Sequence, residues 1–150
     1  MESNIQIKVK NKSRNPIPEY GKVGNSGVDL RANIDKPLII KPGQRLLVPT
    51  GLFLKLPLNV EAQVRPRSGL ALNKGLTVLN TPGTVDSNYR GEVCVILINL
   101  DPTEEAIIEP SERIAQLVFS KVLVADLVEV EEVEENTERG STGFGNSGRF

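Results

Sequence analysis

The sequence predicts an all-β fold, a jelly-roll-like β-barrel with one short helix and a flexible C-terminal arm. Three observations predict it: short apolar runs recur along the chain, turns rich in proline and glycine separate them, and a single segment has the residue types of a helix. The chain has 150 residues, which suits one domain with a modest core. We place the β-barrel domain at residues 1–133 and the arm at 134–150.

Alternating apolar and polar residues identify the strands of the first half of the chain. The pattern is present in Ile5–Val9, Val28–Ala32 and Val60–Arg65, and each is expected to be a half-buried strand. Leu38–Ile40 and Arg45–Val48 stand on either side of a Lys-Pro-Gly-Gln turn. We therefore predict that these two segments form a hairpin.

The one predicted helix begins at Ser68 and runs through Asn73. A serine at the start of a helix can accept a hydrogen bond from a free backbone N–H, so Ser68 is expected to be the cap. Gly75 is expected to end the helix because glycine readily adopts the left-handed conformation.

More strands are expected in the second half of the chain. Val93–Leu100 is apolar almost throughout, as in a strand that is covered on both faces, here by another subunit on one of them. Ala106–Ile108 and Ile114–Phe119 are shorter strands. Val122–Val133 is predicted to be the last strand because its second half alternates valine with glutamate.

Residue types that the sequence lacks exclude several kinds of catalytic and metal site. It contains no histidine, which excludes Ser-His-Asp and Cys-His catalysis and the usual histidine metal sites. The single cysteine, Cys94, lies in an apolar run and is interpreted as a buried small hydrophobe. Catalysis would then use carboxylates, hydroxyls, Arg, Lys and backbone amides, and a metal would be a hard, oxygen-preferring ion carried partly by a ligand.

Charge and hydropathy exclude two kinds of partner. The formal net charge is −1, which gives no indication of a basic surface for nucleic acid. No apolar run reaches membrane-spanning length, and the N-terminal residues lack the charged and apolar regions of a signal peptide. We therefore expect a cytoplasmic protein with no membrane and no nucleic-acid partner.

The stretch Asn80–Glu92 is predicted to contain a hairpin. Pro82-Gly83 suits a type II turn, with glycine at the position that requires a positive φ. The turn joins two β-like runs, Leu76–Asn80 and Thr84–Asp86.

This hairpin gathers three side chains with distinct chemistry. Asp86 could accept a proton from water, Tyr89 could stack on a ring, and Asn80 could read the edge of a base. The alternative is a surface hairpin in which the aspartate and asparagine are turn residues and the tyrosine is a half-buried core ring.

The C-terminal residues also admit two interpretations. Almost nothing from Glu134 onward can enter a core, so this stretch is expected to be mobile on its own. It is either a disordered tail or an arm that orders over a bound nucleotide. In the second case its glycines offer backbone amides to phosphate, Arg139 offers a guanidinium fork and Phe144 offers a stacking face.

Five segments of the chain stand out together: Ser26–Ala32, Pro66–Ala71, Asn80–Glu92, Glu112–Phe119 and Arg139–Gly148. In order and spacing they resemble the five motifs of the trimeric dUTPase family. The resemblance implies a jelly-roll subunit in a homotrimer, with three sites at subunit interfaces that draw motifs from different chains. It also implies the reaction dUTP + H2O → dUMP + pyrophosphate, with Mg2+ held largely by the triphosphate.

The resemblance gives the hairpin three roles. Asp86 looks like the carboxylate that activates the water attacking the α-phosphorus. Tyr89 looks like the ring under the deoxyribose, which leaves no room for a 2′-hydroxyl. Asn80, with the backbone groups of Gly83 and Val85, would read uracil, so that a wrong base leaves polar groups unpaired.

The other motifs imply contacts with the phosphates and the metal. The phosphate-binding residues would be Arg67, Ser68, Gly69 and Gln116. Asp29 resembles the acid that holds Mg2+ through water. In the arm, Arg139 would bind the γ-phosphate, Phe144 would stack over uracil next to Gly145, and Ser147 would lie near the terminal phosphate.

Some of these residues have structural alternatives. Asp29 could instead only pair with Arg31 or cap a turn, and Gln116 could be an outward strand residue. Arg113 is interpreted as a structural ion-pair partner and not as a ligand contact. The family's arm commonly reads Arg-Gly-x-Gly-Gly-Phe-Gly-Ser-Thr-Gly, whereas here Thr142 replaces a glycine and Asn146-Ser147 replace Ser-Thr. A β-branched residue tolerates positive φ poorly, so the path of the arm near Thr142 is open.

Two other functions compete with this one. A dCTP deaminase-like enzyme shares the fold, but that family typically carries Phe-Glu-Gly where this chain has Tyr89-Arg90-Gly91, and an arginine cannot replace the glutamate that takes part in deamination. The other competitor is a non-catalytic nucleotide-binding interaction module that uses the arm as a switch.

Overall fold

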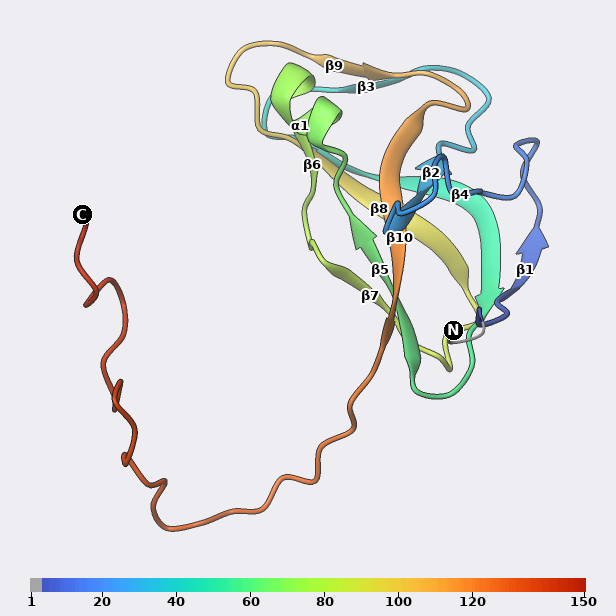
Figure 1. Ribbon diagram of the computed structural model, residues 1–150. Helices are drawn as coiled ribbons and strands as arrows, with labels where there is room; N and C mark the ends of the chain where they lie inside the picture. The colour runs from blue at the N-terminus through green and yellow to red at the C-terminus, as the bar shows by residue number, and fades with distance from the viewer. Residues whose placement is uncertain (1–3) are drawn as a thin grey trace.

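Two antiparallel sheets that share one hydrophobic core form the body of the chain, shown by a computed structural model that describes residues 4–150 (Figure 1). Their strand orders are β1-β4-β8-β6 and β2-β10-β5-β7, and a separate ladder pairs β3 with β9. The elements are β1 (Lys8–Asn11), β2 (Gly27–Arg31), β3 (Leu38–Ile40), β4 (Arg45–Lys55), β5 (Val60–Arg65), α1 (Ser68–Lys74), β6 (Leu76–Val78), β7 (Gly83–Val85), β8 (Glu92–Asn99), β9 (Ala106–Ile108) and β10 (Arg113–Lys121).

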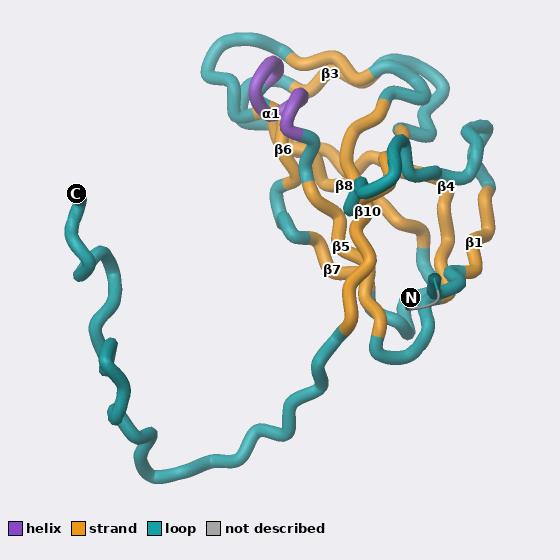
Figure 2. Tube along the Cα trace, viewed as in Figure 1, coloured by secondary structure: helices purple, strands orange, loops and turns teal. Residues whose placement is uncertain are grey.

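This architecture confirms the antiparallel β class with one short helix (Figure 2). The ladders of residues 4–150 stay separate, so the expected closure into a barrel is not seen. Alternate residues of the inner strands fill the core, as in Val28 and Leu30 of β2 and Val93, Val95 and Leu97 of β8. No helix in residues 4–150 is long and apolar enough to cross a membrane.

The predicted hairpin between Leu38–Ile40 and Arg45–Val48 is wrong. The Lys41–Gln44 turn does form, but β3 pairs with β9 and β4 pairs with β8. Asn99 explains the separation, because its fully buried side chain donates through Nδ2 to the carbonyl oxygen of Ile40 at 2.9 Å. The end of β3 is thus held by the last residue of β8.

The predicted hairpin around Pro82-Gly83 is also wrong. β6 pairs with β8 in one sheet and β7 pairs with β5 in the other, so the connection crosses between sheets. Gly83 begins strand β7 without the positive φ that a type II turn requires, so the turn is not type II. Gly83 instead allows β7 to lie close to Val64 of β5, since a Cβ on Gly83 would be 3.3 Å from the Val64 Cβ.

Helix α1 has a different start from the predicted one. Its cap is Arg67, and no side chain among residues 4–150 caps the first turn, so Ser68 is the first helical residue and not the cap. The predicted end is confirmed: Gly75 has φ 64°, in the left-handed region, and its N–H donates to backbone oxygens of the last turn.

Strand β4 carries a bulge that matters for the site. Its register with β8 shifts between Pro49 and Phe53, and Gly51 within the shift has φ 73°. A Cβ on Gly51 would lie 2.7 Å from the Ser13 Cβ, so only glycine fits there. The Thr50 hydroxyl donates to the Val93 carbonyl at 2.6 Å and fixes the bulge against β8.

Two other strand predictions need adjustment. The first strand begins at Lys8 and not at Ile5, although Ile7 and Val9 do pack on the core. In β8 only one face is buried within the chain, and Cys94 on the other face is half-buried rather than buried. Burial, and after it the nearby Glu92 carboxylate, raises the pKa of the Cys94 thiol.

The predicted last strand, Val122–Val133, is wrong. Regular structure ends with β10 at Lys121, and residues 122–133 form no strand. Figure 1 shows the C-terminal stretch running away from both sheets, so no strand of the described residues 4–150 lies beside it. Its apolar side chains, such as Leu123 and Leu127, are therefore exposed.

Candidate active site

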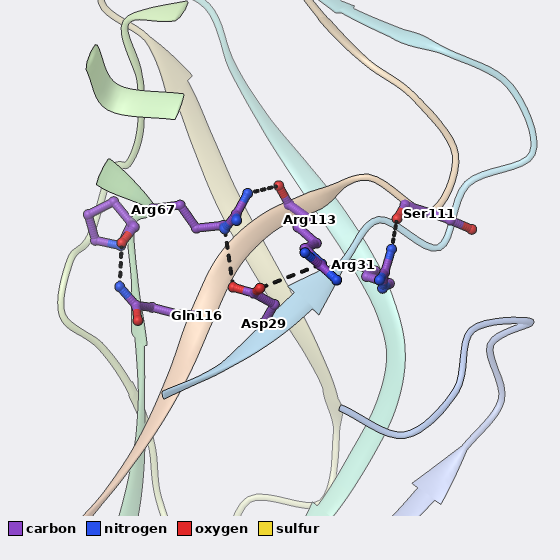
Figure 3. Close-up of polar contacts among 7 residues, drawn as sticks. Asp29, Arg31, Arg67, Ser111, Arg113 and Gln116 are labelled. Carbon is purple, nitrogen blue, oxygen red and sulfur yellow. Dashed lines mark hydrogen bonds and ion pairs between the residues drawn. The ribbon is translucent and has the colours of Figure 1, made fainter. Parts of the chain in front are cut away.

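A cluster of charged side chains forms where β2, β5 and β10 lie side by side (Figure 3). Asp29 of β2 accepts a hydrogen bond from Arg67 Nε at 3.1 Å, and its other oxygen lies 3.6 Å from Arg113 Nε. Arg67 Nη1 also donates to the Arg113 carbonyl at 3.3 Å. The interpretation of Arg113 as an ion-pair partner is confirmed.

The alternative pairing of Asp29 with Arg31 is wrong. Arg31 donates through Nη1 to the carbonyl of Ser111 at 2.9 Å, away from the Asp29 carboxylate (Figure 3). The Asp29 carboxylate therefore lies between the guanidinium groups of Arg67 and Arg113, and this cluster carries a net positive charge.

Gln116 of β10 connects this cluster to the start of α1. It is level with Asp29 on one side and Arg65 on the other, and it donates through Nε2 to the Pro66 carbonyl at 3.0 Å. A Cβ on Gly27 would lie 2.9 Å from Gln116 Oε1, so Gly27 leaves the room that this amide needs. Gln116 thereby fixes the backbone that carries Arg67 and Ser68.

A pocket of about 940 Å³ opens over these residues. Five residues that the sequence assigned to phosphate or metal line it: Asp29, Arg67, Ser68, Gly69 and Gln116. Its charged lining residues are three arginines, Arg31, Arg67 and Arg113, and two acids, Glu19 and Asp29. The loop before β2 lines another part of the pocket. The exposed Ser68 hydroxyl and the exposed or partly exposed guanidinium groups make this pocket suited to an anion.

The residues after β7 form a tight turn that holds Asp86 and Tyr89 together. The Tyr89 N–H donates to the Asp86 carbonyl at 3.1 Å, and the Tyr89 hydroxyl donates to the Glu92 carbonyl at 2.9 Å. Tyr89 is 46% exposed, and the side chains that pack on the hydrophobic core in residues 4–150 do not include it, which speaks against the core ring of the alternative interpretation. Asp86 is exposed next to it. Asn80 lies close to the start of β7, where its amide would be 3.2 Å from a Cβ on Gly83.

The strand register separates this turn from the pocket within one chain. In the strand register, Val85 of β7 pairs with Ala62 of β5, and Ala62 pairs with Phe119 of β10. Gln116 lies three residues before Phe119 on β10. Asp86, which follows Val85, is therefore displaced from Gln116 by four residues along the strands and by two strands across the sheet. Strand spacing and rise then put the Cα atoms of Asp86 and Gln116 roughly 16 Å apart. One chain alone does not bring Asp86 to the pocket.

The arm residues lie apart from both groups. The hydrogen bonds of residues 134–150 are local, as between Arg139 Nε and the Thr142 carbonyl at 2.9 Å. Residues of the arm enclose a small hollow of their own, of about 390 Å³, whose lining includes Arg139, Phe144, Gly145 and Ser147. Positive φ falls on Phe144 and three glycines of the arm, not on Thr142, so threonine causes no backbone strain there.

Two residues that the sequence analysis did not assign to the site support the Asp86 turn. Arg90 donates through Nη1 to the carbonyls of Ser87 and Tyr89, at 2.8 and 3.1 Å. Glu92 accepts the Gly51 N–H on a carboxylate oxygen at 2.7 Å. Both bind backbone atoms, which leave no pattern in a sequence; a glycine within an apolar run, Gly51, was the one available indication of the bulge.

The acidic residues offer little to a metal by themselves. Residues 4–150 contain no group of three or more His, Cys, Asp or Glu side chains placed to hold an ion. Both oxygens of Asp29 already face arginines. These residues therefore fit a hard ion such as Mg2+, which keeps several waters and is carried mainly by phosphates, and they do not fit an ion held by the protein alone.

Comparison with known proteins gives a family match and close relatives. The family model described as dUTPase matches residues 4–148. A deoxyuridine 5′-triphosphate nucleotidohydrolase of Fusobacterium nucleatum is 50% identical over 145 residues, covering 97% of this chain and 98% of that protein. One from Chlamydia pneumoniae is 55% identical over 132 residues, covering 88% of this chain and 90% of that protein.

Solved structures support the fold. The dUTPase of Staphylococcus bacteriophage 80alpha, solved as a mutant with dUpNHpp, superposes with a TM-score of 0.84 at 24% identity, covering 97% of this chain and 100% of that one. The same phage enzyme with dUpNHpp gives a TM-score of 0.82. At this identity the likeness establishes the fold alone.

Proposed function

Because this chain belongs to the dUTPase family, we propose that it hydrolyses dUTP to dUMP and pyrophosphate, with Asp86 activating the water that attacks the α-phosphorus. The observation that carries the proposal is the pocket over Arg67, which gathers Ser68, Gly69 and Gln116 around a net positive cluster. Such a pocket is suited to a polyanion such as a triphosphate. The relatives from Fusobacterium nucleatum and Chlamydia pneumoniae, 50% and 55% identical to this chain, are both deoxyuridine 5′-triphosphate nucleotidohydrolases.

The working site is composed from more than one chain of a homotrimer. The separation of roughly 16 Å between Asp86 and Gln116 is too long for both to act on one α-phosphorus from the same chain. A second copy can supply the Asp86 turn to the pocket of the first. Leu47 and Leu79, which lie on β4 and just after β6, are 65% and 43% exposed and offer apolar surface for such contacts.

Within the composite site, the turn after β7 handles the nucleoside and the water. Asp86 accepts the proton of the attacking water, a role typically worth about 10²–10⁴-fold in rate. The Tyr89 ring packs under the deoxyribose and excludes a 2′-hydroxyl. Asn80, with the backbone of Gly83 and Val85, pairs with uracil, and a base with a different polar edge would leave these groups unpaired.

The phosphates are bound by the pocket and then covered by the arm. Arg67, Ser68, Gly69 and Gln116 contact the phosphate oxygens. Arg139 then binds the γ-phosphate, Phe144 stacks on uracil next to Gly145, and Ser147 contacts the terminal phosphate. Closing the arm, residues 134–150, excludes bulk water from the reacting centre.

Mg2+ is the metal that this site suits. When bound, it would neutralise charge on the triphosphate and on the departing pyrophosphate. Asp29 would contact it through water, because both carboxylate oxygens are engaged by Arg67 and Arg113. The two arginines themselves hold Asp29 in place.

A release assay tests this function directly. The purified protein with Mg2+ is given dUTP, dCTP, dTTP and UTP, and pyrophosphate and ammonia are both measured. We expect pyrophosphate from dUTP alone. Ammonia from dCTP would instead indicate a deaminase, and dUTP binding without pyrophosphate would indicate the non-catalytic module. The cytoplasmic location and the domain boundary at residue 134 stay predictions.

A further inference from the structure

We propose that Arg90 is a positioning residue that holds Asp86 and Tyr89 in their working geometry; this inference rests on the function proposed for that turn. The evidence is the direction of its side chain. Arg90 Nη1 donates to the Ser87 carbonyl at 2.8 Å and to the Tyr89 carbonyl at 3.1 Å. The guanidinium therefore folds back over the turn and holds two of its carbonyls with a single nitrogen.

The turn needs such a donor because it lies outside the strand ladders. Residues 86–91 stand between β7 and β8, and the hydrogen bond from Tyr89 N–H to the Asp86 carbonyl is the one backbone bond that closes them. Backbone carbonyls without a ladder partner otherwise depend on water. Arg90 forms no ion pair with a carboxylate of residues 4–150, so its polar contacts are all with this turn.

One end of this arrangement fixes Asp86. Ser87 directly follows Asp86, and its carbonyl is the shorter of the two Arg90 contacts. The Asp86 carbonyl itself is held by Tyr89 N–H at 3.1 Å. The two peptides that follow Asp86 are thus each held through their carbonyl, the first by Tyr89 N–H and the second by Arg90. Together they restrain the backbone that sets the direction of the Asp86 carboxylate.

The other end fixes the Tyr89 ring. A Cβ on Gly91 would lie 2.3 Å from the Tyr89 hydroxyl oxygen and 2.5 Å from Cζ, so the ring lies across residue 91 and requires glycine there. The hydroxyl then donates to the Glu92 carbonyl at 2.9 Å. Arg90 also binds the Tyr89 carbonyl. Removing the Arg90 side chain would therefore release the backbone of Tyr89 and let the orientation of its ring vary.

The test uses two properties that a merely structural residue would not change together: turnover, and discrimination between dUTP and UTP. Arg90→Met keeps the stem and removes the donors, and Arg90→Lys keeps the charge without the planar fork. Arg45→Met is the matched control, because Arg45 is exposed and forms no ion pair in residues 4–150. Oligomeric state and Tm are measured for each variant.

For Arg90→Met we expect kcat on dUTP to fall on the order of 10- to 100-fold, the scale of a small misplacement of reacting groups. We also expect the ratio of kcat/KM for dUTP over UTP to fall. Arg90→Lys should lie between wild type and Arg90→Met, and Arg45→Met should match wild type. In a Tyr89→Ala background, Arg90→Met should not lower the dUTP/UTP ratio further, because Arg90 acts on that ratio through Tyr89.

Other outcomes overturn the inference. A higher KM for dUTP with unchanged kcat and unchanged sugar discrimination would make Arg90 a direct phosphate ligand. Full activity in Arg90→Lys would show that turnover depends on the positive charge at residue 90 and not on the hydrogen bonds from its guanidinium to two carbonyls. If Arg90→Met does not fold, the same measurements on Arg90→Lys decide. Failure of wild-type protein to release pyrophosphate from dUTP would refute the proposed function instead.

Discussion

The Glu92 carboxylate accepts a hydrogen bond of 2.7 Å from the backbone N–H of Gly51. This contact joins the end of the Asp86 turn to the bulge of β4, where the ladder with β8 is interrupted and Gly51 N–H has no strand partner. Gly51 is buried, so the bond satisfies a donor that water reaches poorly.

Loss of this acceptor should destabilise the protein. We expect Glu92→Ala to lower the free energy of unfolding by about 1–3 kcal/mol, the cost of leaving a buried donor unpaired. Glu92→Gln, whose side-chain oxygen can still accept, should lose less. Urea unfolding of the three proteins checks this, and equal losses in both variants would show that the bond to Gly51 is not the cause.

Removing the Asp86 carboxylate should abolish most turnover and leave binding intact. We expect Asp86→Asn to lower kcat by about 10²–10⁴-fold, because the amide cannot accept a proton from water. Affinity for a non-hydrolysable dUTP analogue should stay close to that of wild type. Asp126→Asn, at an exposed aspartate of the C-terminal stretch, is the control. An unchanged kcat in Asp86→Asn would remove Asp86 from its role.

Deleting residues 139–150 should show whether the arm serves catalysis or assembly of the oligomer. We expect the truncated chain to keep its oligomeric state, because these residues hydrogen-bond only locally. Its turnover should fall on the order of 10²-fold or more as Arg139 and Phe144 are lost. Sizing by light scattering and a dUTP assay check both points. Monomers after truncation would make the arm a structural element instead.

Thr142 should help to organise the arm before it closes. Its hydroxyl donates to the Arg139 carbonyl at 2.7 Å while Arg139 Nε donates to the Thr142 carbonyl at 2.9 Å. Thr142→Gly loses one of these bonds and adds backbone freedom, so we expect kcat/KM for dUTP to fall about two- to fivefold. Thr142→Ser keeps the hydroxyl and should lose less. An equal or higher kcat/KM in the glycine variant would contradict this role.

Local patterns predicted most strands, but not their partners. The alternation in Val28–Ala32 and Val60–Arg65 identified β2 and β5, and Gly75 identified the end of α1. Two predicted hairpins were wrong because short turns can also connect different sheets. The buried Asn99 and the close contact at Gly83 decide those pairings, and both depend on residues far away in the sequence.

A local pattern also predicted a strand that does not form. Val122–Val133 alternates like a strand, yet it pairs with no strand of residues 4–150 and its side chains are exposed. The candidate site was also predicted only in part. The motif resemblance named Asp29, Arg67 and Gln116, which do meet, but the supporting contacts of Arg90 and Glu92 are to backbone atoms and leave no sequence pattern.

Mixing two inactive variants tests the central claim most directly, that the Asp86 turn of one chain acts at the Arg67 pocket of another. Asp86→Asn and Arg67→Ala chains are each assayed alone, then unfolded together in equal amounts and refolded. In a randomly mixed ring, about one quarter of the sites would combine an intact turn with an intact pocket, so we predict recovery of about a quarter of wild-type activity. Mixed assemblies that stay as inactive as their parents would contradict the account.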